Sequence, residues 1–142
     1  ILDLYTKQIV GWKLSDRMTT DIVMDALDQA YKAKKPGKGL IHHSDRGSQY
    51  ASNEYREQLK KYRMKASMSR KGNCYDNACI EAFHSILKRE LIYCNPKFKT
   101  KQDALEKLFR YIEFFYNRKR SNSTLGYMSP VRFEQQYYSR AA

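Results

Sequence analysis

The sequence lacks the features of membrane and secreted proteins. None of its apolar runs approaches the length of about 20 residues that spans a bilayer, and its first residues do not form a signal peptide. Ile1 is not a start methionine, and the chain opens within a strand-like stretch, so we expect further sequence before it. With 142 residues, 42% of them hydrophobic and 30% charged, the composition predicts one soluble, globular domain with a hydrophobic core.

The sequence also lacks a disulfide framework and a zinc motif. It contains few cysteines and histidines: Cys74, Cys79 and Cys94, and His42, His43 and His84. Three cysteines cannot all pair with one another, none forms a CxxC motif, and the spacing of the six residues is not that of a zinc site. We therefore expect reduced thiols in a cytoplasmic protein. Repeats, low-complexity tracts and long linkers are absent from the sequence as well.

Acidic residues are scarce relative to basic ones. The chain has 27 Lys and Arg residues against 15 Asp and Glu, which gives a net charge of +12. A charge of this size predicts a polyanionic partner. Charge alone also fits a basic protein that is merely soluble. A membrane surface is disfavoured as the partner because the basic residues are spread over the chain and are not gathered on one amphipathic helix.

The first half of the chain predicts strands and one helix. Two β-branched and aromatic runs within residues 1–14 flank Thr6-Lys7 and indicate a hairpin. From Thr19 or Thr20, apolar residues recur at helical spacing up to the Pro and Gly that follow Lys35. Residues 39–43 form a short strand, which ends in a turn-like segment at residues 44–47.

The second half is mainly helical. We expect a helix, a strand, a mobile loop and a long helix at residues 52–62, 64–68, 69–76 and 77–93, with Asn95-Pro96 ending the long helix. Thr100 and Asp103 then cap a last long helix, and a short helix follows Pro130. The apolar stripe of the capped helix is expected in the core: Leu105, Leu108, Phe109, Ile112, Phe115 and Tyr116. This order of elements predicts an α/β fold with a mixed sheet.

Two carboxylates are candidates for chemistry. Asp45 comes just after the carboxyl end of a short strand, where open α/β sheets usually bind ligands and metals. Taken alone, an Asp before Gly47 is more typical of a turn. Glu81 lies beside the apolar stripe of the long helix, and Lys88, two turns on, lies on the same flank. The alternative for Glu81 is a solvated side chain that pairs with Lys88 or Ser85.

Several spaced motifs resemble one family. HSDRGSQY at 43–50, SRKGNCYDNA at 69–78 and EAFHSILKRE at 81–90 resemble the catalytic core of bacterial insertion-sequence transposases, whose superfamily includes the retroviral integrases. The 35 residues between Asp45 and Glu81 match the spacing of the family's second Asp and its Glu, and Lys88 stands at the family's basic position. The opening LDLYTKQIVGW and the segment at 116–134 match as well, so that the resemblance covers essentially the whole chain.

The resemblance implies a ribonuclease-H-like α/β fold, a mixed sheet flanked by helices whose N-terminal strand is missing here. Residues 1–142 would be an integrase-type catalytic core, incomplete at the N-terminus, with 96–142 as its C-terminal helical extension. The family's first catalytic Asp lies on the strand before the one that opens this chain, and Asp3 is not its equivalent. Asn122 stands where the family commonly has a His.

The implied activity is metal-dependent DNA strand cleavage followed by strand transfer. Asp45, Glu81 and the missing Asp would hold two Mg²⁺ ions, which Mn²⁺ can replace. The resemblance also implies contacts to transposon-end and target DNA by Lys88, Arg70, Lys71, Arg89, Gln49 and Asn77. We expect a multimer acting on bacterial DNA at the nucleoid, and a chain that on its own binds DNA without joining it. The alternatives are a nuclease of the same fold that only hydrolyses, and a non-enzymatic DNA-binding remnant.

Overall fold

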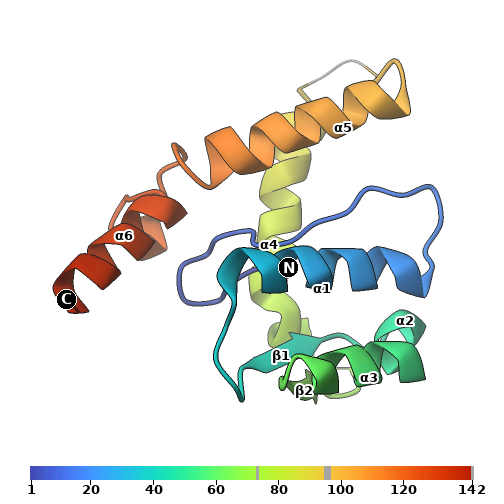
Figure 1. Cartoon of the computed structure of the whole chain (residues 1–142). Coiled ribbons are helices and arrows are strands. Elements are labelled where there is room, and N and C mark those ends of the chain that lie inside the picture. The colour runs from blue at the N-terminus through green and yellow to red at the C-terminus, as the bar shows by residue number, and fades with distance from the viewer. Residues whose placement is uncertain (73, 95–96, 142) are drawn as a thin grey trace. The chain divides into compact units, whose positions relative to one another are not determined.

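The computed structural model describes residues 1–72, 74–94 and 97–141, and it shows helices together with a small sheet (Figure 1). Its contacts divide the chain into two compact units. The first unit contains Ile1 and Val10–Glu81, and the second contains Leu2–Ile9 and the chain from Ala82 onward. Asn73 of the expected loop and the expected helix stop at Asn95-Pro96 lie outside the described residues.

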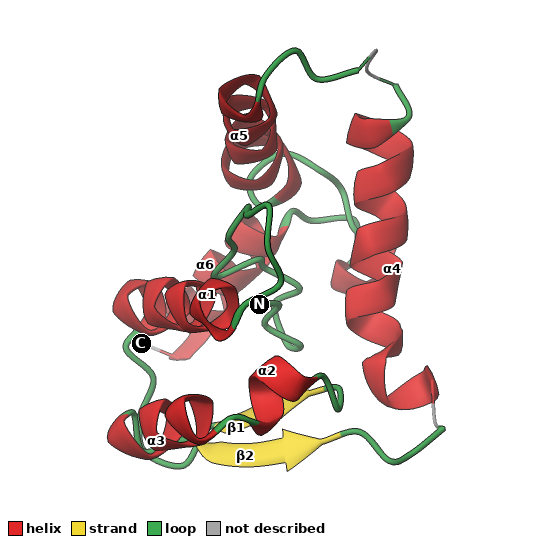
Figure 2. Ribbon diagram, turned by 90° about the vertical axis from the view of Figure 1, so that its right-hand side faces the viewer, coloured by secondary structure: helices red, strands yellow, loops and turns green. Residues whose placement is uncertain are grey.

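The first unit contains a parallel pair of strands. β1 (Ile41–Ser44) pairs with β2 (Lys65–Met68) in a register that sets Ile41 opposite Lys65 and Ser44 opposite Met68. Figure 2 shows the two strands side by side, and α3 (Asn53–Lys61), which connects them, packs on β2. Both strands confirm the sequence prediction to within two residues.

The helices of the first unit begin and end where their sequence directs. α1 (Thr20–Lys34) ends at Lys35, which adopts a left-handed conformation (φ 43°) and donates its N–H to the Tyr31 carbonyl. Such a residue is a common helix C-cap. α3 begins at Ser52, whose hydroxyl oxygen accepts the Tyr55 N–H, a standard N-cap. A four-residue helix, α2 (Ser48–Ala51), lies between the turn expected at residues 44–47 and the helix expected from residue 52, where the sequence predicted no element.

The core of the first unit forms between these helices and the sheet. Leu27 of α1 packs with Tyr55 and Leu59 of α3, and all three are at most 4% exposed. Tyr31 and Tyr62 stack with their ring centroids 3.7 Å apart. Burial of the α3 face thus holds the β1–α3–β2 connection in place, and with it the ends of both strands.

The second unit is helical and contains two π-helical segments. α4 (Ala78–Leu87) begins in the first unit, after the 3-10 turn η1 (Cys74–Asn77), and is continued by the π-helix η2 (Lys88–Ile92). α5 (Lys101–Phe109) runs into a second π-helix, η3 (Arg110–Tyr116). The 3-10 turn η4 (Ser123–Leu125) and α6 (Pro130–Ala141) complete the unit. Thr100 caps α5 as predicted, because its Oγ1 accepts the Asp103 N–H.

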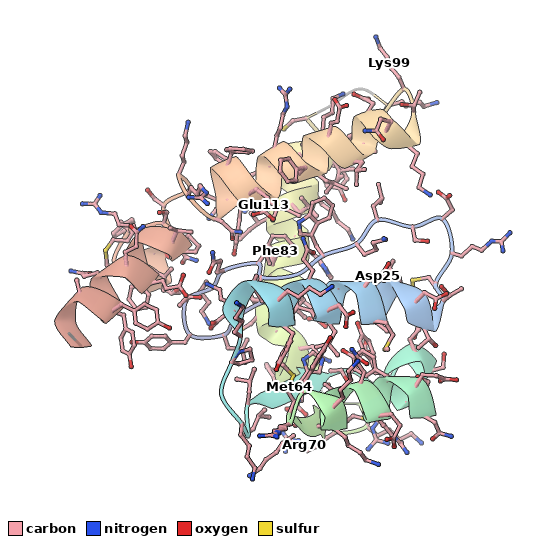
Figure 3. All side chains as sticks on the ribbon, in the orientation of Figure 1. Asp25, Met64, Arg70, Phe83, Lys99 and Glu113 are labelled. Atoms are coloured by element: carbon pink, nitrogen blue, oxygen red, sulfur yellow. The ribbon has the colours of Figure 1, made fainter. Side chains whose placement is uncertain are left out.

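Side chains from separated segments hold the second unit together. Phe83, labelled in Figure 3, meets Tyr116 edge to face at 4.9 Å between ring centroids. The buried Asn117 side chain exchanges two 2.9 Å hydrogen bonds with the backbone of Ile9, so it replaces a strand partner there. The expected hairpin is reduced to one antiparallel bridge, Leu2 to Ile9, and the regular sheet of the described residues has only β1 and β2.

The expected core stripe of the last long helix is wrong in part. Ile112 and Tyr116 are buried, but Leu105, Phe109 and Phe115 are 38%, 47% and 43% exposed. For Phe115 the reason is the π-helix η3, whereas Leu105 and Phe109 lie in α5, which precedes it. A π-helix has i→i+5 hydrogen bonds, so residues five apart share a face, and Tyr111 joins Tyr116 in the core. None of the helices in the described ranges is long and apolar enough to cross a membrane.

Candidate active site

Parallel pairing brings two chain segments to one edge of the sheet. β1 ends at Ser44 and β2 ends at its partner, Met68, so that Asp45 and Ser69 leave the strands together. The Ser69 N–H donates to the Ser44 carbonyl at 2.9 Å, which extends the pairing by one residue. The carboxyl edge of parallel strands is where α/β proteins usually place their ligands.

Asp45 is exposed at this edge and held by its own turn. Its Oδ1 accepts the Gly47 N–H at 2.7 Å, so the turn expected from the sequence is present and orients the carboxylate. A Cβ on Gly47 would lie 3.0 Å from Asp45 Oδ1 and 2.8 Å from Gln49 Oε1. Residue 47 therefore has no room for a side chain while Asp45 and Gln49 keep their places.

Tyr50 packs against the core of the first unit. Its ring meets Tyr55 edge to face at 5.4 Å between centroids. Burial raises the pKa of the Tyr50 hydroxyl, and the negative charge of Asp45 raises it further.

Ser69 ties the start of the Glu81 helix to the same edge. It is 4% exposed, and its hydroxyl donates to Asn77 Oδ1 at 3.0 Å. Asn77 ends η1, and Glu81 follows in the first turn of α4, where it is exposed. Asp45 and the helix turn that carries Glu81 are therefore anchored to neighbouring residues of one edge.

His43 is a member of this edge that the sequence did not single out as a site residue. Its Nδ1 lies 2.9 Å from Ser67 Oγ, and its Nε2 lies 3.3 Å from Ser69 Oγ. Arg46 adds a further link, since its Nε donates to the Ser69 carbonyl at 2.9 Å. Only the pairing of His43 with Ser67 could have indicated this role from the sequence. That pairing can be recognised only when the register of the two strands is known.

The loop after β2 is pinned by an ion pair. Asp76 accepts the Arg70 N–H at 2.9 Å and the Arg70 guanidinium at 3.0 Å. The hydrogen bonds from Arg70 lower the pKa of Asp76, and the same bonds raise the pKa of Arg70. The Arg70 side chain, labelled in Figure 3, is still 76% exposed. Arg70 can therefore offer donors to an anion while Asp76 holds its backbone.

The other predicted contact residues are distributed over both units. Lys71 is exposed in the loop of the first unit, and Gln49 and Asn77 are half-buried at the sheet edge. Lys88 and Arg89 open the π-helix η2 of the second unit, and both are exposed.

The donor chemistry of the edge suits a hard cation. Asp45 and Glu81 offer exposed carboxylate oxygens, which Mg²⁺ prefers over nitrogen and sulfur ligands. Across the described residues, no group of three or more His, Cys, Asp or Glu is arranged to hold a metal ion. Asp45 and Glu81 are therefore the candidate carboxylates for such a site.

Two family models, each described as an integrase core domain, match residues 1–74 and 81–138. The IS600 31 kDa protein of Shigella sonnei is 45% identical over the whole chain, and the IS904 transposase of Lactococcus lactis is 46% identical over 94% of it. The IS3A transposase InsF of Escherichia coli is 42% identical over 94% of the chain. This chain spans only 52%, 53% and 46% of the three relatives, about half of their length.

Two solved structures are similar in fold. The HTLV-2 integrase catalytic core, solved with magnesium in a trimeric form, matches with a TM-score of 0.64 at 18% identity, over 93% of this chain and 80% of that one. A chain of the simian T-cell lymphotropic virus intasome bound to PP2A subunit B56 gamma matches with a TM-score of 0.71 at 16% identity. That match covers 93% of this chain and 45% of the other.

Proposed function

Because this chain belongs to the integrase core domain family, we propose that it is the catalytic core of a transposase, which cleaves and joins DNA strands with the help of a divalent metal. The likeness to integrase cores also confirms the expected ribonuclease-H-like α/β fold. We assign residues 1–142 to this core, with 96–142 as a C-terminal helical extension. The reaction would take place on bacterial DNA in the cytoplasm.

The observation that carries the proposal is the shared strand edge. Asp45 leaves β1 there, and the Ser69–Asn77 hydrogen bond anchors the helix turn of Glu81 to the end of β2. These two carboxylates would hold Mg²⁺, or Mn²⁺ in its place. When bound, the ions neutralise charge on the phosphate and activate the attacking oxygen. Asp45 is kept in position by the Gly47 N–H.

The DNA partners follow from charge and from the family. A net charge of +12 favours a polyanion, and the exposed Lys88, Arg89, Lys71 and Arg70 are suited to phosphate contacts. Gln49 and Asn77 lie at the strand edge of the first unit. We expect transposon ends and target DNA to be bound by a multimer of the complete protein. We also expect residues 1–142 alone to bind DNA without joining it, because the family's first catalytic Asp precedes the strand at Ile1.

Two charge-neutral substitutions test the assignment in the complete protein. Asp45→Asn keeps an oxygen to accept the Gly47 N–H, and Glu81→Gln keeps the size of the side chain. Both variants are expected to lose strand cleavage and joining by at least 1,000-fold, about 4 kcal/mol of barrier, while DNA binding changes less than threefold. Glu54→Gln, which removes an exposed carboxylate from the first turn of α3, is the matched control and retains activity.

A pre-cut donor end separates the proposal from its alternatives. Joining of the pre-cut end to target DNA by the unsubstituted protein supports a transposase. Hydrolysis without joining would instead identify a nuclease, and binding without either reaction would identify a DNA-binding remnant. Mg²⁺-dependent joining that survives in either carboxylate variant would overturn the assignment of that residue.

A further inference from the structure

A histidine lies between the two carboxylate-bearing segments of the strand edge. The His43 ring extends from β1 towards β2, where Nδ1 is 2.9 Å from Ser67 Oγ and Nε2 is 3.3 Å from Ser69 Oγ. Ser69 Oγ is in turn 3.0 Å from Asn77 Oδ1. An unbroken row of polar contacts therefore leads from β2 through β1 to the turn that precedes α4, entirely within the first unit.

The number of protons available determines which atom donates and which accepts in each of these hydrogen bonds. The Ser69 hydroxyl has one proton, and the Asn77 Oδ1 that it meets can only accept. The Ser44 carbonyl also lies 3.2 Å from this hydroxyl, but a single proton serves one acceptor at a time, and the contact with Asn77 is the shorter one. With the Ser69 proton directed at Asn77, the His43 Nε2 must be the donor to Ser69 Oγ. A neutral ring then has an unprotonated Nδ1, which accepts from the Ser67 hydroxyl.

The burial of Ser69 makes its contacts hard to replace. Ser69 is 4% exposed, so water cannot easily take the place of a lost partner. If the ring is removed, the Ser69 hydroxyl is free to turn towards the Ser44 carbonyl and to leave Asn77. Asn77 is the residue immediately before α4, whose first turn carries Glu81.

We propose that His43 is a positioning residue that couples the strand end of Asp45 to the helix turn of Glu81, through the hydrogen bonds His43 Nε2–H to Ser69 Oγ and Ser69 Oγ–H to Asn77 Oδ1. The ring touches neither DNA nor metal in this role. It fixes the separation of two carboxylates that must hold metal together. The proposal rests on the proposed function for its consequence in catalysis, but its structural content can be tested without activity.

Two substitutions of His43 each keep one of the two hydrogen bonds of its ring and remove the other. In His43→Gln the amide nitrogen reaches the place of Nε2 and keeps the bond to Ser69. In His43→Asn the amide reaches only the place of Nδ1 and keeps the contact with Ser67. We expect His43→Gln to retain the coupling and His43→Asn to lose it. Ser69→Ala and Ser67→Ala form the matched pair, of which only Ser69→Ala breaks the path to Asn77.

The first readout is hydrogen exchange in the complete protein without metal or DNA. We expect amide exchange in the first turn of α4 to become at least tenfold faster in Ser69→Ala and His43→Asn, and to change less than twofold in Ser67→Ala and His43→Gln. The second readout is the Mg²⁺ concentration that gives half-maximal joining. This concentration should rise at least fivefold in Ser69→Ala and His43→Asn, while the affinity for DNA stays constant.

The two readouts distinguish the failure of each proposal. Equal exchange rates in Ser69→Ala and Ser67→Ala would overturn the coupling, whether or not the protein joins DNA. If the exchange pattern is as expected but the unsubstituted protein joins no DNA, the coupling stands and the proposed function fails. Should both His43 variants fail to fold, the two serine variants decide the question alone. The ¹⁵N chemical shifts of the His43 ring must also show the Nε2–H tautomer, and the opposite tautomer would contradict the proton count.

Discussion

At the scale of single residues, Gly47 decides how Asp45 is held. Its N–H fixes the carboxylate, and the space that a Cβ would need is filled by the ends of the Asp45 and Gln49 side chains. The sequence led us to expect a turn here and a functional carboxylate as competing explanations. The structure shows that the turn is the means by which the carboxylate is oriented.

Gly47→Ala should therefore lower activity without unfolding the protein. The new methyl group would displace the flexible side chains of Asp45 and Gln49, and a shift of about 1 Å in a catalytic group costs on the order of 10- to 100-fold in rate. The measurement is strand joining together with thermal unfolding. Gly37→Ala is the matched control, because a Cβ at residue 37 meets nothing within 4 Å. Equal activity of the two variants would show that the space at residue 47 is irrelevant.

His42 makes the stability of the fold depend on pH. Its Nε2 lies 2.8 Å from the Tyr55 hydroxyl, and burial is the largest cause that lowers its pKa from 6.5 to about 4. The unfolded chain takes up a proton near pH 6.5, whereas the folded chain does so only near pH 4. The stabilisation is therefore complete above about pH 6.5 and is lost as the pH falls towards 4.

Urea unfolding at several pH values measures this effect. Between pH 7 and pH 4 the free energy of unfolding should fall by roughly 2–3 kcal/mol more in the unsubstituted protein than in His42→Gln, which has no proton to gain. Parallel pH curves for the two proteins would show that His42 is not responsible.

At the scale of elements, the regular helices and strands could be predicted, but the π-helical segments could not. Period and capping residues located α1, α3, α5 and both strands, because apolar spacing and caps are local properties. The change to π-helix at η3 depends on which side chains the second unit buries, here Tyr111 and Tyr116 five residues apart. Local sequence does not contain that information, so Phe115 was wrongly expected in the core and Tyr111 was not expected there.

A hydrogen bond joins the two π-helical segments at Glu90, which also forms an ion pair with Arg120 that should matter for stability. Glu90 of η2 accepts from Arg120 at 2.7 Å and from the Tyr111 hydroxyl of η3 at 2.8 Å. The hydrogen bond from Arg120 is the largest cause that lowers the pKa of Glu90. Both charged side chains are largely buried, 21% exposed for Arg120 and 27% for Glu90. A charge left unpaired in such a place costs more than one at the surface.

Arg120→Met should therefore destabilise the protein by about 2–3 kcal/mol, because Glu90 loses its charged partner. Lys60→Met is the control. It breaks the Lys60–Glu57 pair, whose side chains are 72% and 69% exposed, and should change the stability by no more than about 0.5 kcal/mol. The comparison is made by urea unfolding at pH 7. Equal losses in both variants would mean that the Glu90–Arg120 pair is no more than a surface contact.

At the scale of the whole molecule, only those candidate site residues that belong to sequence motifs could be predicted. Asp45 and Glu81 could be proposed from spacing and from the family resemblance, since chemistry restricts those residue types. The contacts of Ser69, Asn77 and His43 could not, because they depend on the register of two strands that are 20 residues apart. Asn122, which stands where the family commonly has a His, has a local structural role. Its side chain caps η4 by accepting the Thr124 N–H.

The net charge leads to a prediction for DNA binding. Residues 1–142 should bind duplex DNA with an affinity that falls steeply as salt rises, because phosphate contacts release counterions. Lys71→Ala and Lys88→Ala should each reduce the slope of log K against log salt by about 1. The control is Lys13→Ala, since Lys13 already pairs with Asp25 at 2.7 Å. Slopes that do not change in any variant would exclude these lysines from the phosphate contacts.

The parallel register of β1 and β2 has a consequence for how the chain reaches its native state. Strands of four residues pair over a short length, and short pairs are prone to slip. In the native register His43 faces Ser67, whose hydroxyl its ring can use. A slip of one residue would set Ala66 or Met68 opposite His43, and neither side chain carries a hydroxyl. The same ring that we assign to the positioning of two carboxylates thereby penalises misaligned pairing while the protein folds.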